Sequence, residues 1–490
     1  MFVSPTNRPR AGAHVKRPQL LLFSLALLVG SSLTGATAQQ KEPPQRPNIV
    51  LLMADDLGYG DLGCQGHPHL HTPHLDQMAQ DGVRFTRFHA AAPVCSPTRA
   101  SCLTGRHPYR CDVPFANAGH LQQGAATLPM LAKQLGYRTG HFGKWHLGTL
   151  TTTVRDSNRG GPKHADHFSP PWQHAFDVCF STEAKVPTLD PMKDPKTGKP
   201  FGTRYWNERG EVVTGNLAGD DSRVIMDRVV PFVRESAAEE TPFLAVVWFH
   251  APHLPVLASA ADRERYREHD EATQHYYGCI TALDREVGRL RTALEEAGLR
   301  DNTVLWFCSD NGPEGQARKA PGSTGGLRGR KRSLFEGGTR VPAMLTWPAM
   351  LAGGQTFGAP ACTSDILPTL AAWLGAALPS SSDAAIIDGV DLAPMLAAAK
   401  RGEPMQRARP IGFESRRMAA WVDGNHKLVA WLRKPSGKGP SDLPAIERVA
   451  LFDLDQDPAE SSDIGDQHPE RTAHMKQALQ TWRESVRRDR

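Results

Sequence analysis

The chain has 490 residues, of which 40% are hydrophobic and 22% are charged, and its formal net charge is +5. This length and balance predict a globular protein of about two domains and exclude a largely disordered chain. Residues 1–38 contain four basic residues and no acidic one, so the remainder carries a net charge of only about +1. A nearly neutral protein gives no reason to expect nucleic acid as a partner.

The N-terminus has the layout of a secretory signal peptide. A basic start precedes an apolar run from Leu20 to Val29, and small residues follow up to Ala38. The run is short for a membrane span, so an uncleaved anchor is the weaker alternative. We therefore expect removal of residues 1–38, no transmembrane helix in the mature chain, and export to the periplasm, the exterior or another extracytoplasmic compartment. Such a compartment permits disulfides among the eight cysteines, but the sequence does not fix their pairing.

Continuous apolar runs at residues 49–53, 243–249 and 304–307 predict strands that are buried on both faces. Between the last two, apolar residues from Ile280 to Leu294 recur at helical spacing, and Gly298 is a typical helix C-cap. Strands that alternate with amphipathic helices predict an α/β domain, with a mostly parallel mixed sheet sandwiched by helices. We expect this large domain to span residues 46–400.

Residues 151–220 are rich in Gly, Pro, His and charged residues and show little periodicity. A long segment of this kind is more often a functional surface loop than a core element, and we expect it to contribute to specificity. A Pro- and Ser-containing stretch near 376–383 indicates that the chain leaves the large domain.

The C-terminal region has the pattern of a second, smaller domain over residues 405–490. Asp423-Gly424-Asn425 separates two apolar runs and predicts a β-hairpin. Met475, Leu479, Trp482 and Val486 lie on one face of a predicted amphipathic helix. This pattern predicts a small antiparallel sheet with a C-terminal helix.

Two polar pairs directly follow predicted buried strands: Asp55-Asp56 after the first, and Asp310-Asn311 after the strand at 304–307. Ligand sites of parallel sheets form beyond the carboxyl ends of the strands, so the two pairs are expected to converge. Oxygen ligands alone suit calcium or magnesium and not zinc. Either pair alone is more often a helix cap or a turn.

Residues 95–99 read Cys-Ser-Pro-Thr-Arg. Ser96 followed by Pro97 predicts a helix that begins here, with the Ser96 hydroxyl as its N-cap. Cys95 would then lie at a helix N-terminus, where unpaired N–H groups and the helix dipole favour an anion. Arg99, one turn further on, adds a positive charge. The alternative is a buried structural cysteine before an ordinary helix.

Lys144 and His146 follow a plausible strand at 137–143. Residues two apart on an extended segment point the same way, which suits two donors to an anionic group. In isolation, a surface lysine and a packed histidine are the usual explanation of such a pair. Further on, His250 and His253 both follow the strand at 243–249 and compete for a functional role.

The motif Cys95-X-Pro-X-Arg99, followed by Leu103-Thr-Gly-Arg106, resembles the signature of the type I (formylglycine-dependent) sulfatases, an arylsulfatase-like family of the alkaline phosphatase superfamily. The resemblance extends from about Pro47 to about Asp463. It implies that a formylglycine-generating enzyme converts Cys95 to formylglycine (3-oxoalanine), whose aldehyde hydrate is the nucleophile. It further implies hydrolysis of sulfate esters, with a sulfated carbohydrate or an aryl sulfate as substrate.

The same resemblance assigns the site residues. Metal ligands in the family correspond to Asp55, Asp56, Asp310 and Asn311, completed by the modified Cys95, and the expected ion is Ca²⁺, with Mg²⁺ as the alternative. The remaining catalytic positions correspond to Arg99, Lys144, His146, His253 and Lys331.

Two of these assignments depend on local context. His253 has the His-X-Pro setting of the family's active histidine, which leaves a structural or outer role for His250. Lys331 precedes the Glu336-Gly-Gly block as the family's lysine does, but arginines flank it here where the family usually has glycines.

The sequence leaves two alternatives to sulfate-ester hydrolysis. A phosphomonoesterase, phosphodiesterase or phosphonate hydrolase of the same superfamily shares the oxygen-ligand site, although many such phosphatases bind two zinc ions and need additional histidine ligands. A non-catalytic glycan-binding protein could retain the fold, but the presence of the whole set of catalytic residues argues against it.

Overall fold

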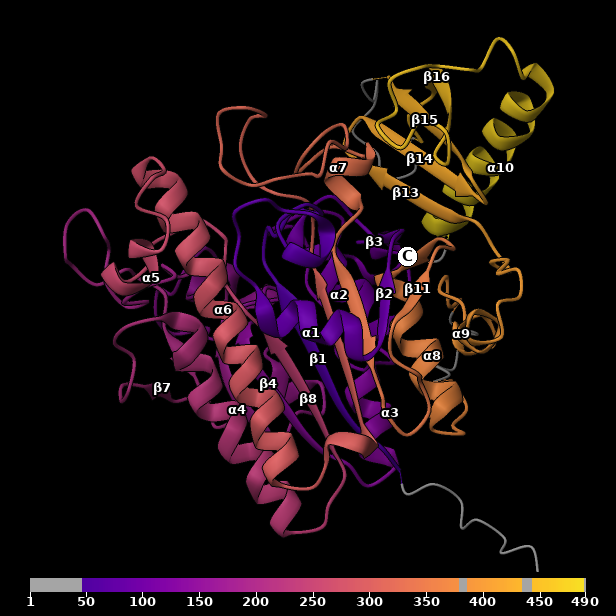
Figure 1. Cartoon of the computed structure of the whole chain (residues 1–490). Helices are drawn as coiled ribbons and strands as arrows, with labels where there is room; N and C mark the ends of the chain where they lie inside the picture. Colours follow the sequence, from indigo (N-terminus) through magenta and orange to yellow (C-terminus); the bar gives the residue numbers. More distant parts are fainter. Residues whose placement is uncertain (1–45, 379–385, 434–442, 489–490) are drawn as a thin grey trace, which may run out of the picture. The chain divides into compact units, whose positions relative to one another are not determined.

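The computed structural model describes residues 46–378, 386–433 and 443–488 (Figure 1). The predicted signal peptide lies outside the described residues, and so does most of the Pro/Ser stretch, because residues 379–385 are not described. All described residues belong to one unit of the chain, residues 45–490.

A ten-stranded mixed sheet forms the large domain, in the order β11-β2-β10-β9-β1-β8-β4-β5-β6-β7. Its strands are β1 (Asn48–Ala54), β2 (Val83–Phe85), β4 (Arg138–Lys144), β5 (Val178–Thr182), β6 (Tyr205–Trp206), β7 (Val212–Val213), β8 (Phe243–Trp248), β9 (Thr303–Ser309), β10 (Ala343–Thr346) and β11 (Gln355–Phe357). The five central strands, from β9 to β5, pair in parallel. This confirms the prediction of a mostly parallel mixed sheet.

Helices cover both faces of this sheet. The helices of the large domain are α1 (Pro73–Asp81), α2 (Cys95–Thr104), α3 (Leu128–Gln134), α4 (Asp221–Ala238), α5 (Ala260–Glu264), α6 (Glu271–Glu296), α7 (Glu336–Thr339), α8 (Ile366–Trp373) and α9 (Ala393–Lys400). On β1, Leu51 faces the core shared with α2, α3, α8 and α9, whereas Leu52 faces the core shared with α1, α4 and α6. Burial on both faces explains why the strand is a continuous apolar run.

The large domain corrects two predictions. Helix α2 begins at Cys95, with Val94 as its N-cap, and the Ser96 hydroxyl is buried without a hydrogen-bond partner. Pro97 is tolerated inside the first turn because the first N–H groups of a helix have no partner within it. The segment 151–220 is not only a surface loop, because β5 within it is a buried parallel strand of the large sheet.

The C-terminal region forms the predicted antiparallel sheet and helix. Its strands are β13 (Ile411–Ser415), β14 (Met418–Asp423), β15 (His426–Leu432) and β16 (Ile446–Asp453), and the helix is α10 (Pro469–Arg488). The hairpin between β14 and β15 turns at Gly424, which has the positive φ of +57° that a tight hairpin requires. Met475 and Leu479 of α10 pack against the apolar face of this sheet. In Figure 1 this sheet runs from orange to yellow, and α10 beside it is yellow.

A buried ionic cluster joins the small sheet to the large domain. Lys427 of β15 donates to Glu336 Oε1 at 2.8 Å, and its Nζ lies 3.1 Å from Glu460 Oε1. His89, on the short strand β3 (Phe88–His89), lies with its Nε2 3.2 Å from the Glu336 carboxylate. Lys427 and both glutamates are fully buried, so their charges depend on one another for compensation, and Arg340 Nη1, 3.7 Å from Glu336 Oε2, is the second cation near Glu336.

Lys427→Met should lower the free energy of unfolding by about 3–5 kcal/mol, because among the described residues Glu460 then has no ion-pair partner and Glu336 keeps Arg340, 3.7 Å away, as its only cation. Urea unfolding measures this change. Lys476→Met, on the exposed face of α10, is the matched control and should stay within about 0.5 kcal/mol of the wild type. Equal stability of the two variants would contradict the proposed role of the cluster.

Candidate active site

The predicted catalytic residues converge beyond the carboxyl ends of β1, β9 and β4. A cavity of about 340 Å³ is lined by Cys95, Lys144, His146, His253 and Lys331. Arg99 lies behind the cavity wall and is fully buried. Residues from distant parts of the chain therefore meet at the end of the sheet where ligand sites of such folds form.

Strand pairing brings the acidic residues together. In the parallel register of β1 and β9, Ala54 lies opposite Ser309, so Asp55 and Asp310 follow side by side. The Asp56 N–H donates to Asp310 Oδ1 at 3.1 Å, and Asn311 Nδ2 donates to Asp56 Oδ1 at 2.7 Å. All four residues are buried, and three of them are carboxylic acids.

Three cations face these three acids. Arg99 donates to Asp310 Oδ2 at 2.7 Å and to the Lys144 carbonyl oxygen at 2.9 Å. Lys144 donates to Asp55 Oδ2 at 2.5 Å, and Lys331 donates to Asp56 Oδ2 at 2.8 Å. The one-to-one pairing makes the buried charges tolerable in a medium where an unpaired ion costs several kcal/mol.

The two carboxyl groups at the strand ends titrate differently. Burial raises the pKa of Asp310 to about 7, and the charge of Asp55 adds to this rise although Arg99 opposes it. Burial acts on Asp55 in the same direction, but Lys144, with His253 and Arg99, holds the pKa of Asp55 well below its usual range. The repulsion between the two neighbouring carboxylates moves their pKa values apart.

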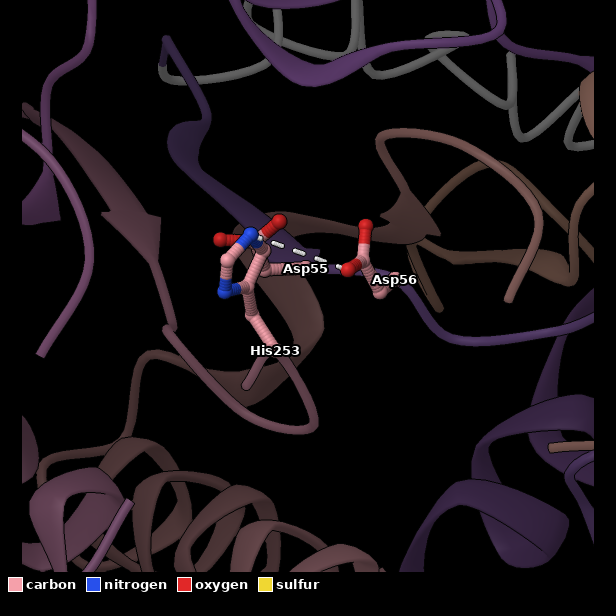
Figure 2. A group of neighbouring side chains, drawn as sticks. All are labelled: Asp55, Asp56 and His253. Atoms are coloured by element: carbon pink, nitrogen blue, oxygen red, sulfur yellow. Dashed lines mark ion pairs between the residues drawn. The ribbon is translucent and has the colours of Figure 1, made fainter. Parts of the chain in front are cut away.

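The donor set fits a hard divalent cation. Asp55 Oδ1 and Asn311 Oδ1 are buried oxygens without a hydrogen-bond partner. One ligand atom each of Asp55, Cys95 and Asp310 lie within 4.8 Å of one another, and the same holds for Asp55, Asp56 and His253. Figure 2 shows this second group, with His253 directed at the two carboxylates. Oxygen donors of this kind suit calcium or magnesium.

Cys95 lies in the first turn of α2 and is 2% exposed. Burial raises the pKa of its thiol, although Lys144 and Lys331 oppose this rise. The unmodified side chain is therefore a protonated thiol and a weak nucleophile. Its sulfur marks the place that the oxygens of a formylglycine would take.

The two competing histidines have different surroundings. His253 borders the cavity with its side chain 14% exposed, and its Nε2 lies 3.7 Å from Asp56 Oδ2 (Figure 2). Burial lowers the pKa of His253 to about 4, against the pull of the two aspartates. His250 is fully buried, with Nδ1 2.7 Å from Asp221 Oδ2 and Nε2 2.8 Å from Thr182 Oγ1.

Several lining residues were missed by sequence reasoning: Asn117, Asn158, Lys185, Glu314 and Arg332. Asn117 Oδ1 lies 2.9 Å from His146 Nε2 and accepts a bond from Asn158 at 3.1 Å. Glu314 accepts two bonds of 2.7 Å from Arg332. The position of Glu314 just after Asp310-Asn311 was an available signal, whereas nothing near Asn117 in sequence marks it as part of the site.

Comparison with known proteins decides the family. The sequence profile described as Sulfatase matches residues 47–376. The chain belongs to the sulfatase family. As a member of that family it is a sulfuric ester hydrolase.

Similar proteins cover most of this sulfatase. Mouse (Mus musculus) steryl-sulfatase is 30% identical over 546 aligned residues, which cover 91% of this chain and 82% of the relative. Rat (Rattus norvegicus) N-acetylgalactosamine-6-sulfatase is 32% identical, with 78% of this chain and 70% of the relative covered. Among solved structures, that of Ps i-CgsB in complex with k-i-k-neocarrahexaose has a TM-score of 0.75 at 26% identity and covers 90% of this chain and 93% of its own.

The surroundings of the two histidines predict different effects of substitution. His253→Ala should lower kcat by roughly 100-fold or more, because a bound sulfate raises the pKa of a histidine at the cavity and lets it transfer a proton to the leaving oxygen. The loss should be smaller for esters of acidic phenols, whose leaving groups need little protonation. His250→Ala should instead reduce stability by about 1–3 kcal/mol, because it orphans the buried Asp221 and Thr182.

Each variant is the control for the other, with kcat and the melting temperature measured for both. A kinetic defect confined to His250→Ala, with His253→Ala close to the wild type, would show that His250 is the functional histidine.

Proposed function

We propose that this sulfatase hydrolyses sulfate esters of carbohydrates, with a formylglycine formed from Cys95 and a single Ca²⁺ ion. The observation that carries the proposal is a cavity lined by Cys95, Lys144 and Lys331, with three buried carboxylates directly behind it that pair with these lysines and with Arg99. Two oxygens of this buried group, Asp55 Oδ1 and Asn311 Oδ1, have no hydrogen-bond partner. A carbohydrate is favoured because the rat relative is named for an amino sugar and the Ps i-CgsB structure is a complex with k-i-k-neocarrahexaose.

Asp55, Asp56, Asp310 and Asn311 would hold the ion, and Mg²⁺ is the alternative to Ca²⁺. A bound divalent ion supplies Lewis acidity, which polarises an oxygen of the sulfate group and orients it. A formylglycine at position 95 would supply the nucleophilic hydroxyl that an unmodified, protonated thiol lacks.

The basic residues would handle the charge of the sulfate group. Arg99 is fixed between the Lys144 carbonyl and Asp310, so its positive charge is already oriented before substrate binds. Lys144 and Lys331 line the cavity, with their ammonium groups bonded to Asp55 and Asp56. Burial disfavours the charged form of Lys331, but Asp56 and the neighbouring acids raise its pKa above the usual range, so it keeps its proton.

A proton must reach the leaving oxygen as the S–O bond breaks. His253 and Lys331 both border the cavity and are the two candidates for this donor. Lys331 keeps its proton, whereas His253, with its lowered pKa, becomes a donor only if the bound sulfate raises that pKa. His146 would contribute a contact to the sulfate group, and its ring is positioned by the 2.9 Å bond with Asn117. General acid catalysis of this kind contributes roughly 10²–10⁴ in rate.

We further propose that the protein is exported and is modified by a formylglycine-generating enzyme. None of the helices among the described residues is long and apolar enough to cross a membrane. All eight cysteines, each within the described residues, are free thiols in the structure. Export rests on the signal-peptide pattern of residues 1–38, which the structure does not describe.

Co-expression with a formylglycine-generating enzyme should convert Cys95, because Pro97 and Arg99 supply the motif after it. Mass spectrometry should find the peptide at least partly as the aldehyde or its hydrate. Cys102→Ala, a buried cysteine of the same helix, is the control and should leave the conversion intact. Fully active protein that contains only unmodified Cys95 would refute this part of the proposal.

Asp310→Ala should lower the metal content and the hydrolysis of sulfate esters together, the latter by about 100-fold or more, because an anionic ligand is lost. Elemental analysis and a sulfate-ester assay with added calcium measure the two quantities. The exposed Asp301→Ala is the matched control and should change neither. Two zinc ions per chain, with phosphate esters hydrolysed faster than sulfate esters, would favour a phosphatase instead.

A further inference from the structure

A second cavity, of about 480 Å³, adjoins the one that contains Cys95. Asn158 and Lys185 line both cavities, so their side chains form the boundary between them. All residues of the second cavity come from the segment 151–220, which carries no residue of the predicted catalytic set. The cavity therefore has access to whatever part of a substrate extends beyond the reacting sulfate.

Hydrogen bonds connect Asn158, at the boundary, to the predicted catalytic residue His146. Asn158 Nδ2 donates to Asn117 Oδ1 at 3.1 Å, and the same oxygen lies 2.9 Å from His146 Nε2. Asn158, at the boundary of the second cavity, is thus two hydrogen bonds away from His146, the residue proposed to contact the sulfate.

The second cavity is basic. Arg155, Lys185 and Arg204 line it, and no acidic residue does. Among the described residues, neither Arg155 nor Lys185 has an ion-pair partner within 4 Å. Lys185 is half-buried, so its charge is less screened by water than that of an ordinary surface lysine.

The acid that pairs with Arg204 does not cancel the charge of the other two cations. Asp156 is fully buried, does not line the cavity, and lies 3.5 Å from Arg204 Nη1. Its two oxygens already accept bonds from the Trp206 indole N–H and from the Arg204 backbone N–H. Arg155 and Lys185 therefore remain available to a ligand.

An aromatic ring completes the lining. Phe201 borders the cavity and is partly exposed. The electron-rich face of such a ring packs well against the C–H face of a pyranose, while guanidinium and ammonium groups bind carboxylates and sulfates. The combination of one ring and two cations without an ion-pair partner among the described residues matches a sugar that carries an anionic group.

We propose that the second cavity binds an anionic group, either a carboxylate or a second sulfate, on the sugar next to the one whose sulfate ester reacts at Cys95. The substrate class is then an oligosaccharide with at least two anionic groups. This inference rests on the proposed carbohydrate sulfatase function and adds a specificity site to it.

The test compares kcat/KM for three disaccharides: one with a single sulfate and no other charge, one with an added carboxylate, and one with a second sulfate. The wild type should prefer at least one doubly anionic disaccharide by about tenfold or more over the singly sulfated one. That preference should fall by about tenfold in Lys185→Met and by about threefold in the more exposed Arg155→Ala. Lys163→Ala, an exposed lysine of the same segment that lines neither cavity, should leave it unchanged.

Equal efficiency of the wild type on all three disaccharides, or an unchanged preference in both variants, would overturn the inference while leaving the sulfatase function intact. If no sulfate ester is hydrolysed, the proposed function fails, and binding decides the inference separately. In Cys95→Ala protein, calorimetry should then show weaker binding of the doubly sulfated disaccharide when Lys185→Met and Arg155→Ala are added. Unchanged binding would refute it.

Discussion

Three carboxylic acids at the ends of β1 and β9 are withdrawn from water, and the structure around them is organised to balance their charge. Asp55, Asp56 and Asp310 each have a cationic partner, and the partners come from three separate segments of the chain. An unpaired buried charge costs more free energy than most single packing defects. The positions of α2, β4 and the segment around Lys331 are therefore fixed by the need to bring a cation to each aspartate. A chain that folds must bring these segments together, and in doing so it assembles the cavity.

The same balance explains how the site can bind a sulfate ester. With the three carboxylates and three cations alone, the local charge is close to zero, and the ammonium groups are directed at the aspartates. A divalent cation on the unpartnered oxygens of Asp55 and Asn311 would add positive charge and free the lysines to face an anion. The second, basic cavity then extends the positive field along the length of an oligosaccharide, with Lys185 at the junction.

Sequence reasoning succeeded where one local pattern determines the outcome. The buried runs of β1 and β9 and the acidic pairs after them are short-range signals, and parallel pairing is enough to bring Asp55 and Asp310 together. It failed where tertiary contacts decide. Ser96 is a residue type favoured at N-caps, yet the N-cap is Val94, two residues earlier, and β5 has five residues between irregular segments, too few to show a period. Lys427 bonds to Glu336, which lies 91 positions earlier in the chain, and no local sequence pattern predicts this contact.

Binding of a divalent ion should make the carboxylates at the ends of β1 and β9 exchange their lysines for the metal, and the proposed chemistry depends on this exchange. A crystal structure of the Cys95→Ala protein with calcium, collected to give the anomalous signal of the metal, tests it most directly. We predict a single peak bounded by Asp55, Asp56, Asp310 and Asn311, with the ammonium groups of Lys144 and Lys331 turned from the aspartates toward the cavity. No peak at this position, or a peak with both lysines still paired to Asp55 and Asp56, would contradict the exchange.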